Sequence, residues 1–82
     1  MNKTELLSKL AALLAATDHL PEDAIILNAA ANNTSGVEIQ IYNAIPPAGA
    51  IRKRINLQSV IYTWPLAGGV SACTCKEEPI ND

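Results

Sequence analysis

Residues 37–43 alternate between apolar and polar side chains, and this alternation limits the possible folds more than any other feature of the chain. Its apolar positions are Val37, Ile39 and Ile41, and Glu38 and other polar residues stand between them. A period of two is typical of a β-strand with one buried and one solvated face. Because such a strand needs neighbouring strands and a cover for its apolar face, the segment predicts a sheet with a second layer.

Residues 3–17 predict a helix that can supply this second layer. Asn2 can cap the helix, and Glu5 follows three residues later, as in a capping box. Leucines recur at close to the helical repeat, and the alanines between them favour helix formation. We expect the leucine side of this helix, which includes Leu6, Leu10 and Leu13, to lie across the sheet. The chain leaves the helix before Pro21, because the residue before a proline avoids the helical conformation.

Three further segments predict strands, and the turns between them are short. The strands are expected at 24–31, apolar on both faces, at 51–64 with an interruption by a bulge, and at 70–76; the turns are expected at 32–36, 44–49 and 65–69. Short turns favour antiparallel neighbours. The predicted fold is therefore α+β, with one N-terminal helix packed on one face of a roughly four-stranded antiparallel sheet, in the order αββββ.

The chain has 82 residues, which is the size of one small domain, so residues 1–82 are expected to share a single core. Residues 77–82 are polar and are expected to form a frayed tail. No stretch approaches the roughly 20 apolar residues that a membrane helix needs. The N-terminus lacks the pattern of a secretory signal, which favours a cytoplasmic location and reduced thiols.

Cys73 and Cys75 are the first candidates for chemistry. A single C-x-C lacks the second ligand pair of a zinc site, and it is not the C-x-x-C of redox proteins. The favoured interpretation is that both are ordinary strand cysteines. A metal shared between subunits and a redox or intermolecular pairing remain as alternatives. His19 follows the helix, where a histidine interacts favourably with the carbonyl end of the helix dipole.

The remaining polar residues do not resemble an active site. Glu22–Asp23 and Glu77–Glu78 are neighbouring carboxylates in a turn and a tail, where both members of each pair are solvated. General acid–base catalysis instead needs two carboxylates in different environments. Gly68–Gly69 lacks the lysine and hydroxyl of a phosphate-binding loop. We therefore expect a protein that is not an enzyme and that has no catalytic residues, no cofactor and no metal site.

The segment 51–64 carries the most informative surface pattern. Its odd positions are mostly apolar and are expected to face the helix, so its even positions are expected to face outward. Tyrosine, tryptophan and arginine are enriched at binding hot spots. The predicted partner-binding residues are Tyr42, Arg52, Arg54, Gln58, Tyr62 and Trp64. Two alternatives are an ordinary solvated face and, for Arg52–Arg54, a charged strand that protects a sheet edge from pairing.

These features predict a small, cytoplasmic, non-enzymatic protein-interaction module that uses an exposed sheet face or edge. Its partner is a protein or a second copy of the chain, as in a homodimer, and not a membrane. Its size suits accessory, adaptor or inhibitor roles, such as those of proteins encoded by phages or mobile elements. The alternative is a nucleic-acid-binding module that uses the basic and aromatic residues. A net charge of −2 makes nucleic acid the less favoured partner.

Overall fold

The computed structural model describes residues 2–31 and 36–80, and it confirms the α+β class with one N-terminal helix. Five strands follow the helix, one more than the sequence predicted. The elements are α1 (Lys3–Ala16), a 3-10 turn η1 (Thr17–His19), β1 (Ile25–Ala31), β2 (Val37–Tyr42), β3 (Ile51–Arg54), β4 (Ser59–Ala67) and β5 (Val70–Glu77). Residues 32–35, where the sequence predicted a turn, lie outside the described residues.

The strands form one sheet in the order β1-β2-β5-β4-β3, so β1 and β3 are its two edges. β1 pairs with β2, β4 with β5, and β3 with β4, all antiparallel. The expectation of a wholly antiparallel sheet is wrong at its centre, because β2 and β5 run parallel, with Val37 opposite Val70. The β3–β4 hairpin provides the connection that a parallel pair requires between its strands.

Helix α1 begins as the sequence predicts but packs mainly through its C-terminal half. The side chain of Asn2 accepts a hydrogen bond from the backbone N–H of Glu5 at 2.8 Å. Ala16 is fully buried, and Ala12 and Leu13 pack beside it against the core. The expectation that the leucine side would lie across the sheet is confirmed for Leu13 but wrong for Leu6 and Leu10, which are 41% and 40% exposed.

The core is a thin layer between α1 and the middle of the sheet. Ile39 is completely buried at the centre of β2, and Val37 and Ile41 flank it on the same face, as the alternation predicts. Val70 and Ala72 of β5 complete the buried cluster. Because few large side chains are fully buried, the sheet depends strongly on each of them.

The stretch 51–64 is a hairpin and not a single long strand. β3 and β4 are joined by a turn over residues 55–58, and Arg52 lies opposite Tyr62 in the register. The expected orientation is reversed: Val60 of the even set is fully buried, and Trp64 packs against the core cluster on the helix side. The odd positions therefore project from the face opposite α1.

Residues 77–80, part of the tail that we expected to fray, make strand and backbone contacts in the structure. Glu77 belongs to β5, and the backbone N–H of Glu78 donates to the carbonyl of Gln58 at 2.9 Å. The N–H of Ile80 donates to the carbonyl of Leu57 at 3.1 Å. Residues 78–80 are thus attached to the β3–β4 turn, and residues 81–82 lie outside the described residues.

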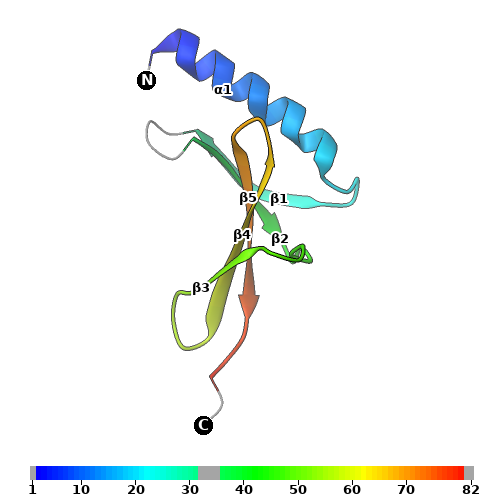
Figure 1. Ribbon diagram of the computed structural model, residues 1–82, viewed down its shortest axis with the longest axis vertical. Coiled ribbons are helices and arrows are strands. Elements are labelled where there is room, and N and C mark those ends of the chain that lie inside the picture. Colours follow the sequence, from blue (N-terminus) through cyan, green and yellow to red (C-terminus); the bar gives the residue numbers. More distant parts are fainter. Residues whose placement is uncertain (1, 32–35, 81–82) are drawn as a thin grey trace.

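The molecule is elongated. Its principal extents are 51 × 27 × 21 Å. Its Cα radius of gyration is 13.9 Å, whereas a compact chain of this length is expected near ~11.7 Å. Figure 1 shows α1 across one end of the sheet, while β3 and the C-terminal segment lie at the other end. The helix therefore covers only part of one face.

Candidate interaction surfaces

Three of the predicted partner-binding residues gather around Glu78 at the end of the sheet that α1 does not cover. One guanidinium nitrogen of Arg52 (Nη2) donates to Glu78 Oε1 at 3.1 Å, and the hydroxyl of Tyr62 donates to Glu78 Oε2. The guanidinium of Arg54 donates to the backbone carbonyls of Glu78 and Asn56, each at 3.0 Å. This cluster binds the C-terminal segment to the β3–β4 hairpin.

Within the cluster, Glu78 and Arg52 change each other's pKa. The hydrogen bond from Tyr62, reinforced by the one from Arg52, lowers the pKa of Glu78 below its ordinary value. The same carboxylate raises the pKa of Arg52, chiefly through their hydrogen bond. Both side chains are partly solvated, so the ion pair contributes little to stability. The main consequence of these contacts is that the side chains of Arg52 and Arg54 already have hydrogen-bond partners within the chain.

Glu78 was missed by the sequence interpretation, which treated Glu77–Glu78 as a solvated pair in a frayed tail. Gln58 was predicted as a contact residue through its side chain. In the structure Gln58 makes its contacts through the backbone. Its carbonyl accepts a hydrogen bond from the N–H of Glu78, and its own N–H donates to Asn56 Oδ1 at 2.8 Å. The signal that could have found Glu78 is the run of cations Arg52–Arg54, because a cation beside a sheet can pair with a carboxylate such as Glu78.

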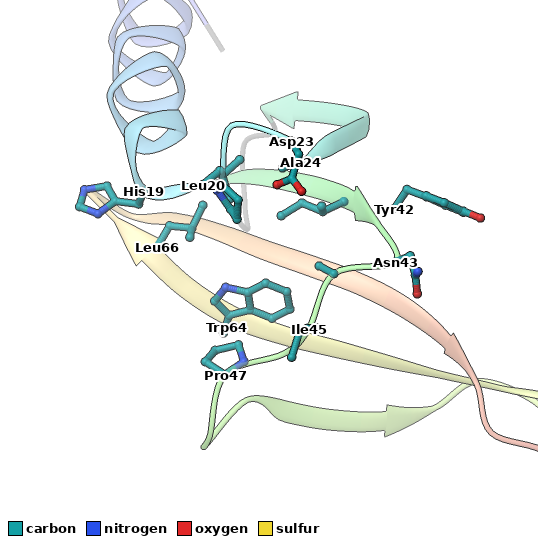
Figure 2. Close-up of a pocket in the computed structure, with 13 residues that line it drawn as sticks. His19, Leu20, Asp23, Ala24, Tyr42, Asn43, Ile45, Pro47, Trp64 and Leu66 are labelled. Atoms are coloured by element: carbon teal, nitrogen blue, oxygen red, sulfur yellow. The ribbon is translucent and has the colours of Figure 1, made fainter.

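Trp64 and Tyr42, the other two predicted residues, do not join this cluster. Trp64 is half-buried near the end of α1 and lines a hollow of about 430 Å³ together with Leu20, Leu66 and Pro47. Tyr42 is 59% exposed at the rim of the same hollow. Figure 2 shows the tyrosine ring directed away from Trp64. The predicted site is thus divided between two ends of the molecule.

The two cysteines have different environments. Cys73 is only 4% exposed, and its thiol donates to Glu38 Oε1 at 3.0 Å. Burial, with this hydrogen bond, raises the pKa of Cys73 to about 12. Cys75 is exposed, and both are free thiols. At neutral pH Cys73 is therefore a protonated, weakly nucleophilic side chain.

A large share of the apolar side chains lies outside the core. Among the described residues, thirteen large hydrophobic side chains are at least 40% exposed. They lie on α1, on β1, at the rim of the hollow, around the β3–β4 hairpin and near the C-terminus: Leu6, Leu7, Leu10, Leu14, Ile25, Ile26, Leu27, Tyr42, Ile45, Ile51, Ile55, Leu57 and Ile80. Scattered apolar residues are ordinary on a surface, whereas contiguous ones mark interaction sites.

Two groups are close together in the sequence: the leucines Leu6, Leu7, Leu10 and Leu14 on α1, and Ile25–Leu27 on β1, the strand at one edge of the sheet. The three side chains are 57%, 46% and 62% exposed. β1 has seven residues, none of them charged and none a proline. The opposite edge, β3, has four residues, and Arg52, Lys53 and Arg54 are three of them. Charged residues on an edge strand discourage pairing with another strand, so β3 is protected and β1 is open.

No family model, curated protein or solved structure matches the chain. Within residues 2–31 and 36–80, no helix is long and apolar enough to cross a membrane. In the same part of the chain, no three or more histidine, cysteine, aspartate or glutamate side chains are grouped as metal ligands.

Proposed function

We propose that this protein is a non-enzymatic interaction module that binds a protein partner by strand addition to its open β1 edge. One observation carries the proposal: β1 is an uncharged edge strand with three consecutive large apolar side chains exposed. We call this strand, Ile25–Ala31, the β1 edge.

An edge of this kind offers two binding features at once. The outer backbone N–H and C=O groups of the strand lack a neighbouring strand, so a partner strand can satisfy them. The side chains of Ile25, Ile26 and Leu27 add apolar area that a partner can remove from water. Strand addition of this type obtains affinity from the main chain and specificity from alternate side chains.

The proposal moves the interaction away from the face that the sequence suggested. Trp64 packs against the core, and Arg52 and Tyr62 bind Glu78, so these side chains are less free to contact a partner than expected. The same contacts lower the support for nucleic-acid binding, which needs cations that can reach phosphates. We place the interaction in the cytoplasm, as expected from the sequence.

A capture experiment tests this function. The tagged protein is used as bait in a lysate of the native host, beside two variants that each place a lysine on an edge strand. Ile26→Lys alters the β1 edge, whereas Ile51→Lys makes the matched change on β3, where Ile51 is 70% exposed. We expect a stoichiometric protein, foreign or the chain itself, that the wild type and Ile51→Lys retain and Ile26→Lys loses. Capture of nucleic acid alone, or equal capture by all three baits, would contradict the proposal.

A further inference from the structure

We infer that the partner of the β1 edge is a second copy of this chain, whose β1 runs antiparallel to the first across a twofold axis. This inference rests on the proposed function and names its partner. Antiparallel pairing of two identical edges gives a closed, isologous dimer in which each strand satisfies the other. The two five-stranded sheets would then join into one continuous sheet.

Charge distinguishes the two edges as surfaces for self-association. Two copies meeting through β3 would bring together the Arg52–Arg54 run of each, and like charges opposite one another destabilise a strand pair. Two copies meeting through β1 bring no charge together, because its residues are aliphatic except for Asn28. Charge repulsion therefore disfavours pairing of two copies through β3, whereas no charge opposes their pairing through β1.

The β1 edge is also complementary to itself in size. Its first half consists of the large residues Ile25, Ile26 and Leu27, and its second half ends in Ala29–Ala31. In an antiparallel pair the first half of one strand lies against the second half of the other. With Asn28 on the axis, each large side chain has a small neighbour across it. This pairing includes the irregularity between Ile26 and Asn28, and the regular part of the strand is Asn28–Ala31.

The exposed area agrees with what a dimer needs. The chain exposes 5833 Å², whereas a compact monomer of 8.7 kDa is expected to expose about 4,700 Å². The difference is about 1,100 Å², and a standard interface buries about 800 Å² per partner. This surplus is spread over an elongated chain and is not confined to β1, but its size is comparable to one partner's share of a standard interface.

Sedimentation equilibrium of the purified protein tests the inference. We expect the mass to rise with concentration from 8.7 kDa toward twice that value. Leu27→Lys should raise the dissociation constant by at least about 100-fold, because the twofold axis brings both lysines into the interface. Ile51→Lys on β3 is the matched control and should change the constant less than about threefold. A mass of 8.7 kDa at all concentrations, or equal effects of the two variants, would overturn the inference.

A cross-link provides a second test that does not depend on how well Leu27→Lys folds. In a Cys75→Ser background, Asn28→Cys should form a disulfide-linked dimer on mild oxidation, since Asn28 is the middle residue of β1 and lies opposite its own copy at the axis. Lys53→Cys on β3, in the same background, should remain a monomer. Dimer from Lys53→Cys and none from Asn28→Cys would refute the arrangement. A wild type that is monomeric but captures a foreign protein through β1 would refute only the second copy and would leave the proposed function standing.

Discussion

Two substitutions that remove the same three carbon atoms should have very different effects on stability. Ile39 is completely buried at the centre of β2, whereas Leu10 is 40% exposed on α1. Ile39→Ala and Leu10→Ala each delete three carbons from one side chain. The pair therefore compares the core with the helix surface at constant chemistry.

The magnitudes follow from burial. Three buried carbons are worth ~2.4 kcal/mol of transfer free energy at ~0.8 kcal/mol each. The cavity left inside the sheet adds to this, so Ile39→Ala should cost about 3–4 kcal/mol. Leu10 is already partly in water and leaves no closed cavity, and alanine favours the helix, so Leu10→Ala should cost about 1 kcal/mol.

Urea denaturation followed by circular dichroism measures both values, at a protein concentration low enough to keep the chain monomeric. We expect the midpoint to fall much further for Ile39→Ala, while the slope of unfolding free energy against urea stays constant. If Leu10→Ala costs as much as Ile39→Ala, Leu10 is buried and the helix packing described above is wrong.

Three other outcomes are expected. Trp64→Ala should destabilise the fold by about 2–4 kcal/mol in thermal or urea unfolding, because the ring packs against the core; intact stability would contradict this. A thiol reagent at pH 8 should modify Cys75 at once and Cys73 only after unfolding, since the pKa of Cys73 is raised to about 12; equal rates would refute its burial. The stability that this raised pKa represents is complete below the ordinary value of 9.0 and is lost as pH rises toward 12. The pKa of Glu78, followed by NMR, should lie below its ordinary 4.5 and rise toward it in Tyr62→Phe, so that the cluster weakens as pH falls; no change in that variant would exclude the Tyr62 hydrogen bond.

Local patterns in the sequence predicted the elements well. The cap at Asn2, the helix over residues 3–17 and the alternation in residues 37–43 match α1 and β2 to within one residue. These features depend on near neighbours along the chain. Caps and strand periodicity are read from such neighbours without knowledge of the tertiary fold.

The orientation of the long segment 51–64 could not be predicted in the same way. Its odd positions were counted as the apolar set partly because of Ile55 and Leu57. Both lie in the turn between β3 and β4, where a period of two has no meaning. When these two residues are left out, Val60 and Trp64 make the even positions the better candidates for the buried face. The structure buries this face.

The strand order could not be predicted from local sequence patterns either. β1 is as apolar as a central strand, and the sequence predicted that both of its faces are apolar. Its place at the edge follows from the parallel pairing of β2 with β5, which joins segments more than thirty residues apart. The candidate surface therefore became visible only once the topology was known. Glu78 was missed for the same reason, since its partners lie on two other strands.

The most direct test of the account is residue-resolved amide hydrogen exchange of β1 in dilute and concentrated protein. Backbone N–H groups that lack a partner strand exchange quickly, and pairing protects them. We predict that outward amides within Ile25–Ala31 exchange quickly in the dilute sample and become protected in the concentrated one, while those of β3 do not change. Amides of β1 that exchange at the same rate in both samples, with new protection elsewhere, would contradict the account.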